Sequence, residues 1–387
     1  MFPRFWRQPS KAVSIRLADL IQLVEPSAEK ILVMTSRDVA QELASNGSQF
    51  DQKVQFVGNV KCSDNKFILS RVPGELRAQL QISRNLISIS DKIDVIFWRG
   101  RVSTFIVPLL FARLKGKKSI LFVESRPSQS IRKMHRGPLG IGGFISSQIF
   151  KVIEAIDYSL SDRLVADFPG LLNQPWLAKY KNKVFPYPTP IRFVSPDFKI
   201  SSPLNQRPAI VGYIGRMSQE KGVLNFVKTI PLICSQMKEV EFFLGGGGPL
   251  LHQLESELDD LISQGKVKVL DWIPHNELPG YLNQMKLLIL PSYIEGLPII
   301  VLEAMACGTP VLATRVGAVP DLIVDGETGF IMEDNSPECI AQNVIRALNH
   351  PNIDQISRSA RAFIKKEYSY EAMNRKWNKL LTSLSAE

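Results

Sequence analysis

Short runs of β-branched and other apolar residues alternate along the chain with segments of helical periodicity. This alternation favours parallel sheets with crossover helices over a β-sandwich or a helix bundle, so the predicted fold class is α/β. In the first half, strands are expected at residues 30–36, 54–57, 66–69, 94–99 and 119–124, and helices at 71–88 and 103–114.

A proline-rich segment at residues 184–208 separates two such series. Because proline fixes φ and lacks a backbone donor, this segment predicts a domain boundary, with the crossover at residues 190–207. After it, strands are expected at residues 209–214, 240–244, 266–270, 287–290 and 310–313, and helices at 222–234, 250–262, 298–307, 339–348 and 356–384.

With 387 residues, of which 45% are hydrophobic and 22% charged, the chain has the composition of a globular protein of two or three domains. Its longest uncharged apolar stretch, residues 102–112, is far shorter than the roughly 20 residues that cross a bilayer. The start lacks the pattern of a secretory signal, so a cytosolic protein is expected. The four cysteines have neither paired nor metal-ligand spacing and are predicted to be reduced thiols.

The positive charge is concentrated in the first half. Residues 1–200 hold 30 Lys and Arg against 16 Asp and Glu, a net charge of +14, whereas residues 201–387 hold 17 against 21, a net charge of −4. The excess indicates an anionic partner: a membrane surface, a lipid phosphate or a nucleic acid. A basic surface that only aids solubility is the alternative. Because no motif of interleaved basic and aromatic residues is found, no nucleic-acid partner is predicted.

Two basic residues and a glycine run follow the first two strands of the second half. Arg216 and Lys221 lie five residues apart, between a strand and a helix start, where they predict a site for an anion such as a diphosphate. Solvated surface charges are the alternative. Residues 245–248 are four glycines, which let a backbone approach a ligand, although a flexible turn would have the same composition.

Two carboxylates flank the turn between the strand at 287–290 and the next helix. Glu295 lies in the loop and Glu303 in the helix, which Pro298 helps to start. Between them, the amides of Gly296 and Leu297 lie at the positive end of the helix dipole. This arrangement suits a sugar nucleotide, with one carboxylate for sugar hydroxyls, amides for phosphate and a second carboxylate for the ribose diol. The alternative is a dipole partner plus a hydrogen-bonded helix glutamate.

Together these segments resemble the family-4 (group 1) retaining glycosyltransferases of the GT-B fold. The resemblance covers about residues 208–350 and rests on the runs YIGRMSQEKGV, LGGGGPL and DWIPHNELPGYLNQMKLLILPSYIEGLPIIVLEAMACGTPVLATRVGAVPDLIVDGETGF. It implies two Rossmann-like, doubly wound lobes of parallel sheet that face a cleft. Residues 1–200 would form the acceptor-binding lobe and 201–365 the lobe that binds the nucleotide-sugar donor. A terminal helix at 366–387, with the pair Ser369 and Tyr370, would cross back onto the first lobe.

The resemblance also implies roles for single residues. Arg216 and Lys221 would bind the diphosphate and Glu295 would contact the transferred sugar; these three are the predicted catalytic residues. Glu303 would hold the ribose. The remaining residues expected to bind the sugar nucleotide are Trp272 and Ile273 beside the base, and Gly215, Gly247, Gly296, Leu297, Pro298 and Ile299. No metal ion and no cofactor are predicted, because the two cations would replace a divalent ion.

The implied reaction moves a sugar from a nucleoside diphosphate sugar to a hydroxyl of a lipid-linked or saccharide acceptor, with retention, in cell-envelope polysaccharide or glycolipid synthesis. Two departures from the family pattern keep alternatives open. The strand at 119–124 ends in Glu124 where the family has His, and only MFPRFW stands where a first strand belongs. Either the start lies upstream or this lobe lacks a central strand. The alternative functions are an impaired sugar-nucleotide-binding protein and a GT-B epimerase or phosphorylase.

A basic segment followed by apolar residues comes after the strand at 119–124. It holds Arg126, Arg132, Lys133 and Arg136, and then Ile141, Phe144, Ile145 and Ile149. This order predicts peripheral binding to an anionic membrane surface on its cytoplasmic side, near a lipid-phosphate acceptor. Packing of the apolar residues in the core is the alternative.

Overall fold

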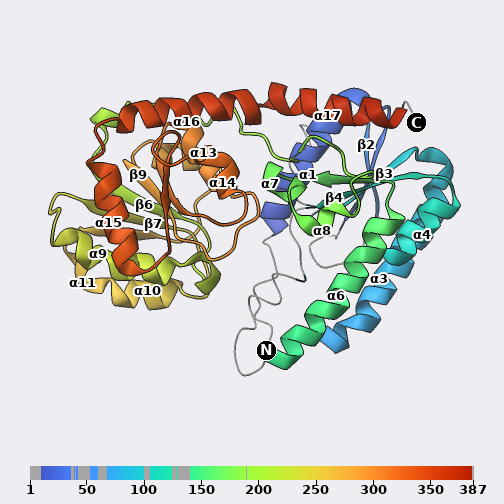
Figure 1. The fold of residues 1–387 in the computed structure, drawn as a ribbon, viewed down its shortest axis with the longest axis horizontal. Coiled ribbons are helices and arrows are strands. Elements are labelled where there is room, and N and C mark those ends of the chain that lie inside the picture. The colour runs from blue at the N-terminus through green and yellow to red at the C-terminus, as the bar shows by residue number, and fades with distance from the viewer. Residues whose placement is uncertain are drawn as a thin grey trace. The chain divides into compact units, whose positions relative to one another are not determined.

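The structure is a computed structural model that describes residues 10–35, 39, 41, 53–59, 68–99, 105–123, 128, 140–188 and 190–385. The chain forms two compact units (Figure 1). The first comprises Met1–Arg192 and Met373–Glu387, and the second comprises Phe193–Ala372. The chain passes from one unit to the other within the proline-rich segment.

The first unit contains two parallel sheets in its described part. Strand β1 (Ile31–Thr35) pairs with β2 (Val54–Asn59). Strand β4 (Lys118–Val123) lies between β3 (Val95–Trp98) and β5 (Arg163–Ala166), and all its residues after Lys118 are buried, as expected of a strand covered on both faces. The helices of this unit include α1 (Ser10–Val24), α3 (Ile68–Ile89), α4 (Ile106–Leu114), α6 (Gly140–Leu160), α7 (Pro169–Leu172) and α8 (Pro175–Ala178).

The strand expected at residues 66–69 is wrong. Ile68 and Leu69 form the start of α3, while residues 66 and 67 lie outside the described part. A short apolar run fits a strand or a buried helix segment equally well, and the helical periodicity that continues to Ile89 decides between them. The other strands and helices expected in the first half overlap β1, β2, β3, β4, α3 and α4. Strand β5 and helix α6 were not predicted.

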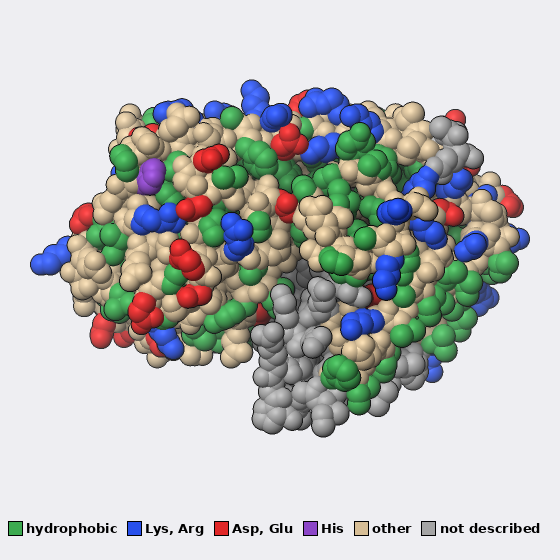
Figure 2. Space-filling model, in the orientation of Figure 1, with side chains coloured by type: hydrophobic (Ala, Val, Ile, Leu, Met, Phe, Trp, Pro, Cys, Tyr) green, Lys and Arg blue, Asp and Glu red, His purple; other side chains and the backbone are tan. Residues whose placement is uncertain are grey.

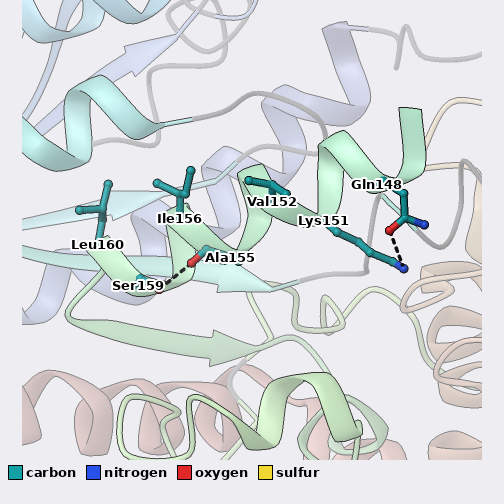
Figure 3. A pocket seen from close by; sticks show the side chains of 7 residues that line it. All are labelled: Gln148, Lys151, Val152, Ala155, Ile156, Ser159 and Leu160. Atoms are coloured by element: carbon teal, nitrogen blue, oxygen red, sulfur yellow. Dashed lines mark hydrogen bonds between the residues drawn. The ribbon is translucent and has the colours of Figure 1, made fainter. Parts of the chain in front are cut away.

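Helix α6 presents apolar side chains to the surface, where hydrophobic residues gather in Figure 2. A shallow groove runs along it, and Figure 3 shows the side chains that line this groove. They are Gln148, Lys151, Val152, Ala155, Ile156, Ser159 and Leu160. Within the described residues, no helix combines the length and the apolar composition that a bilayer crossing requires.

The second unit is built on a six-stranded parallel sheet with the strand order β11-β10-β9-β6-β7-β8. The chain order therefore reverses between β6 (Ile210–Ile214) and β9 (Leu287–Leu290). This is the doubly wound arrangement that the α/β class predicts. The outer strands are β7 (Glu241–Gly245) and β8 (Val267–Leu270) on one side, and β10 (Val311–Thr314) and β11 (Phe330–Met332) on the other.

Helices connect these strands. They include α9 (Val223–Cys234), α10 (Leu251–Glu257), α11 (Asp259–Ser263), α12 (Leu278–Leu282), α13 (Ile299–Ala306), α14 (Val319–Leu322), α15 (Pro337–Leu348) and α16 (Ile353–Tyr368). The single helix expected at 250–262 is two helices, because Leu258 leaves helical geometry at φ −105° and ψ 2°. The short elements β11, α12 and α14 were not predicted.

The single helix expected at 356–384 is also two helices, α16 and α17 (Tyr370–Ser385). Ser369 between them has an extended backbone with ψ 161°, and its hydroxyl accepts a hydrogen bond from Ala372 N at 3.2 Å. A serine that caps the next helix in this way ends one helix and starts another. Farther along α17, the fully buried Trp377 packs against Phe122, with ring centroids 5.7 Å apart, within the first unit.

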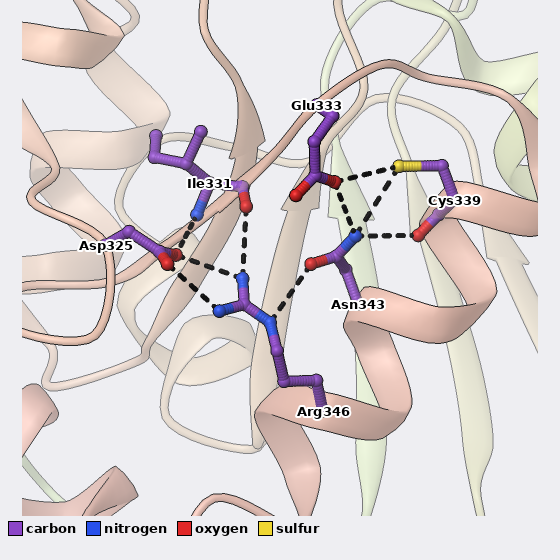
Figure 4. Close-up of polar contacts among 6 residues, drawn as sticks. All are labelled: Asp325, Ile331, Glu333, Cys339, Asn343 and Arg346. Carbon is purple, nitrogen blue, oxygen red and sulfur yellow. Dashed lines mark hydrogen bonds and ion pairs between the residues drawn. The ribbon is translucent and has the colours of Figure 1, made fainter.

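A polar network fixes the β11 edge of the six-stranded sheet in the second unit (Figure 4). Arg346 of α15 donates to both carboxylate oxygens of Asp325 at 3.0 Å and to Ile331 O at 3.0 Å. Burial alone would raise the pKa of Asp325, but the hydrogen bonds that its carboxylate accepts from Arg346 and from Ile331 N hold it below its usual value. Beside this pair, Glu333 accepts hydrogen bonds from Asn343 at 3.3 Å and from Cys339 Sγ at 3.4 Å. The short strand β11 is thereby tied to α15.

Candidate active site

The candidate site lies where the strand order of the six-stranded sheet reverses. Strand β6 pairs directly with β9, with Val211 opposite Leu287. In open α/β sheets, ligands bind outside the carboxyl ends of the strands at such a reversal. The loop after β6 carries Arg216 and Lys221, and the loop after β9 carries Glu295. The three predicted catalytic residues therefore come from the two loops that meet at this point.

An ion pair joins the two loops. Lys221 Nζ lies 2.7 Å from Glu295 Oε1, and the same oxygen accepts a hydrogen bond of 2.6 Å from the Ser292 hydroxyl. The Glu295 side chain is only 6% exposed, whereas that of Lys221 is 27% exposed. The buried carboxylate is thus paired and held in one position, while the ammonium group, which has three N–H donors, still reaches the surface.

Close backbone packing brings these loops together. Gly222, which follows Lys221, has φ +68°, and a Cβ atom there would clash with the carbonyl oxygen of Pro291. Only glycine fits this position without strain. Asn335 Nδ2 also donates to Pro291 O at 2.9 Å. The position of Lys221 relative to the loop after β9 is therefore set by the backbone as well as by its ion pair.

Arg216 is fixed through its backbone and has an acidic neighbour. The hydroxyl of Tyr213 donates to Arg216 O at 2.7 Å. Tyr213 is fully buried, and this burial raises its pKa well above the ordinary value, so the hydroxyl stays a hydrogen-bond donor. Arg216 Nη1 lies 4.0 Å from Glu220 Oε1, and Glu220 accepts a 2.7 Å hydrogen bond from Ser218. The Arg216 side chain is 29% exposed.

The glycine run packs against the loop after β6. Gly246 has φ +123°, and a Cβ atom there would clash with Gly215 O. Next to it, Gly247 O accepts a hydrogen bond from Met217 N at 3.0 Å, and Gly245 O accepts one from Gly215 N at 2.9 Å. The contact that requires glycine at position 246 is therefore one between two loops of the protein itself.

Glu303, the predicted ribose ligand, is paired with a histidine. It lies in α13 with a side chain that is 6% exposed, and its Oε1 is 2.7 Å from His275 Nε2. His275 follows β8, and its ring packs near Phe198 with centroids 5.2 Å apart. The sequence analysis did not single out His275 or Ser292. His275 contacts Glu303 and Ser292 contacts Glu295 only because of the conformation of the loops after β8 and β9.

The other residues expected to bind the sugar nucleotide differ in exposure. Trp272, after β8, is 52% exposed and open to a ligand, whereas Ile273 is buried against Gly245. Leu297 and Pro298 are buried, and Ile299 is the first residue of α13. Gly296 O accepts a 2.9 Å hydrogen bond from Ala318 N, which holds this turn in place.

Several predicted residues cannot be placed. Glu124 and the basic residues Arg126, Arg132, Lys133 and Arg136 lie outside the described residues. Within the described part of the chain, no group of three or more His, Cys, Asp and Glu side chains is arranged to hold a metal ion. The absence of metal and cofactor from the reaction stays a prediction.

Comparison with known proteins identifies relatives of this half of the chain. Residues 194–370 match the family model of group 1 glycosyl transferases. The alpha-D-kanosaminyltransferase of Streptomyces kanamyceticus is 29% identical over 170 residues, which are 44% of this chain and 44% of the relative. The capsular polysaccharide biosynthesis glycosyltransferase CapM of Staphylococcus aureus is 26% identical over 173 residues, again 44% of each chain. The matches thus span less than half the length of these curated relatives.

The whole chain is similar to a solved structure. The crystal structure of Anabaena Alr3699/HepE in complex with UDP and glucose superimposes with a TM-score of 0.69 at 15% identity, over 96% of both chains. The predicted fold is confirmed by this similarity, which extends over both units. The chain therefore has the GT-B fold, and its residues 194–370 are similar to the group 1 glycosyl transferases.

Proposed function

We propose that the chain transfers a sugar from a nucleoside diphosphate sugar to a hydroxyl acceptor with retention of the anomeric configuration. The observation that carries this proposal is the pairing of Lys221 with Glu295 at 2.7 Å, at the reversal of the strand order. A cation beside a carboxylate suits a ligand that has both phosphate and sugar hydroxyls. The solved relative that holds UDP and glucose supports the same ligand class.

In the proposed reaction, the bond between the anomeric carbon and the diphosphate oxygen breaks as the acceptor oxygen bonds to that carbon from the same face. The acceptor proton passes to the departing phosphate oxygen, and the nucleoside diphosphate leaves. Arg216 and Lys221 stabilise the negative charge that develops on this leaving group. Because the ion pair already holds Lys221 in place, little reorganisation is needed as the charge develops. This scheme needs neither a metal ion nor a cofactor.

The two carboxylates have separate proposed roles. Glu295, held by Ser292 and Lys221, accepts hydrogen bonds from hydroxyls of the transferred sugar. Glu303 binds the ribose diol, and its contact with His275 at 2.7 Å fixes the carboxylate for that purpose. The exposed indole of Trp272 offers a face on which the base stacks.

We assign the acceptor to the first unit. The net charge of +14 over residues 1–200 suits a lipid-phosphate or other anionic acceptor and peripheral contact with the cytoplasmic face of a membrane. The products would be polysaccharides or glycolipids of the cell envelope. The name of CapM, a capsular polysaccharide biosynthesis glycosyltransferase, supports this direction.

A panel of nucleoside diphosphate sugars, each offered with lipid-linked and free saccharide acceptors, tests the proposal. The expected result is release of nucleoside diphosphate that depends on the acceptor, with a product whose anomeric configuration, read by NMR, equals that of the sugar nucleotide. A product of inverted configuration would contradict the mechanism. Tight binding of a sugar nucleotide without turnover, across the panel, would instead favour a binding protein.

A further inference from the structure

Helix α6 buries its acidic residues and exposes apolar ones, whereas an ordinary surface helix does the reverse. Its two acidic residues face inward, where Glu154 is 7% exposed and Asp157 is 6% exposed. Glu154 accepts hydrogen bonds from the amide and the hydroxyl of Ser128 at 2.8 and 2.9 Å. Asp157 accepts one from Phe105 N at 3.3 Å. Both acidic side chains are therefore hydrogen-bonded inside the unit and contribute little to its surface.

The outer face of α6 is apolar instead. Residues 145, 149, 152 and 156 follow the helical spacing of one stripe, and Figure 3 shows Val152 and Ile156 on the same side of the helix. The exposed apolar side chains are Phe144 at 52%, Ile145 at 53%, Ile149 at 51%, Val152 at 61% and Ile156 at 38%. A surface helix of a globular protein normally presents its polar side to water.

The neighbouring helices continue this surface. Helix α4 packs against both α3 and α6, and the three lie side by side in Figure 1. Exposed apolar residues on α3 are Leu76, Leu80 and Ile87, and those on α4 are Leu110 and Leu114, the last of them 85% exposed. We call these five residues and the five of α6 the apolar face. Exposed apolar groups on three adjacent helices mark an interaction surface rather than scattered surface residues.

Cations accompany the apolar face. Among charged residues of α3, α4 and α6 whose side chains the structure describes, those that reach the surface are all basic: Arg77, Arg84, Arg113 and Lys151. On α3, residues 77, 80, 84 and 87 share one helical stripe, so its two arginines lie among the apolar residues. Apolar side chains interspersed with cations match the boundary between acyl chains and anionic headgroups.

We propose that the apolar face is the surface through which this protein docks on an anionic membrane. The inference rests on the proposed membrane contact of the first unit and names the residues that make it. A second copy of the chain is a poorer occupant, because a two-fold contact would bring the same four cations against each other. In the docked state, α6 lies along the interface with its apolar side chains in the acyl boundary and the basic residues at the lipid phosphates.

Vesicle sedimentation with the full chain tests this docking. The probe is a vesicle of phosphatidylcholine and phosphatidylglycerol, compared with one of phosphatidylcholine alone, so binding is measured without any sugar nucleotide. The test variant is Ile149→Gln/Val152→Gln. The matched control is Leu232→Gln/Val324→Gln, which alters two similarly exposed apolar residues of the second unit. All four positions lie on the surface, and thermal melts verify the folding of both variants.

The wild type and the control are expected to bind the anionic vesicles, with about tenfold or greater loss of partitioning in Ile149→Gln/Val152→Gln. Arg77→Glu/Arg84→Glu is expected to lower binding to the anionic vesicles, and about 0.5 M salt is expected to weaken the binding of the wild type.

Absence of wild-type binding, or equal binding by the test and control variants, would overturn the proposal. So would a wild-type dimer, seen by sedimentation velocity, that dissociates in the test variant. Loss of glycosyl transfer with vesicle binding intact would count against the proposed function alone.

Discussion

Lys221 Nζ lies 2.7 Å from Glu295 Oε1, and this contact joins the loop after β6 to the loop after β9. Lys221 and Glu295 are 74 residues apart in sequence, yet the parallel pairing of β6 with β9 places the ends of these two strands side by side. The doubly wound topology therefore creates the pair. Its chemical role follows from the burial of the carboxylate and the partial exposure of the ammonium group.

Glu295→Gln is expected to reduce kcat by about 30-fold or more, because the amide cannot hold Lys221 by charge or accept sugar hydroxyls as strongly. Ser292→Ala removes one hydrogen bond to the same oxygen and should cost about 1 to 2 kcal/mol, or 5- to 30-fold in kcat/KM. Steady-state release of nucleoside diphosphate measures both effects. Equal activity of Glu295→Gln and wild type would show that the carboxylate has no part in the reaction.

His275→Ala is expected to raise KM for the sugar nucleotide about 5- to 30-fold with little change in kcat, because it loosens Glu303, which is proposed to contact the ribose and not the reacting carbon. His275→Gln should restore part of the affinity through its amide donor. His252→Ala, at a side chain that is 98% exposed, is the control. A fall in kcat at unchanged KM would contradict this role.

The pH dependence of stability is expected to contain a contribution from Asp157. Burial, opposed by the hydrogen bond from Phe105 N and aided by nearby Glu154, raises the pKa of Asp157 to about 7 from 3.8. The folded state thus favours the protonated carboxyl, so the stabilisation from this group is present below about pH 4 and is lost as the pH rises through 7. Asp157→Asn mimics the protonated form and should be more stable than the wild type at pH 8, by up to about 4 kcal/mol, but not at pH 4.

Urea unfolding at both pH values measures this difference. Asp94→Asn, which removes an exposed carboxyl of the same unit, is the control. An Asp157→Asn variant that is equally destabilised at both pH values would mean that the carboxylate, rather than the acid, is the form the fold requires.

Trp377→Ala is expected to lower the free energy of unfolding by about 3 to 5 kcal/mol, because it empties a fully buried site between Phe97 and Phe122 and leaves Pro190 O without its 3.1 Å hydrogen bond. Trp377→Phe should cost less, since most of the volume is kept. Urea denaturation followed by circular dichroism measures both. A loss below about 1 kcal/mol for Trp377→Ala would show that α17 contributes little to the stability of this unit.

The sequence predicts the second unit better than the first, for physical reasons. Strand β9 was predicted with its observed bounds, because a short, fully apolar run that ends at a Pro-Ser turn fits a buried parallel strand. The run at 66–69 begins with a lysine, is apolar only from residue 67 and continues into a helical pattern, and there the prediction failed. Helix α6 was missed because its apolar residues face outward and its carboxylates inward, the reverse of the usual pattern.

Within the candidate site, the residues of recognisable motifs were predicted from the sequence. The residues that hydrogen-bond to them were not. Arg216, Lys221 and Glu295 stand in recognisable turns, and the structure brings Lys221 and Glu295 together. The partners Ser292 and His275 depend on loop conformation, which no periodicity encodes. For the glycine run, the sequence analysis left open both a backbone that approaches a ligand and a flexible turn; at Gly246 the close neighbour is the protein's own Gly215. Such contacts between loops depend on the order of the strands in the sheet, which the sequence pattern does not give.

The central claim, that Lys221 stabilises a diphosphate leaving group, is tested most directly by the turnover of Lys221→Ala beside that of Lys228→Ala. Lys228 is an exposed lysine of α9, so its removal changes the net charge equally without reaching the loop after β9. The account predicts that Lys221→Ala loses about 2 to 4 kcal/mol of transition-state stabilisation, or roughly 30- to 1000-fold in rate, while Lys228→Ala turns over like the wild type. Unchanged turnover of Lys221→Ala would contradict it.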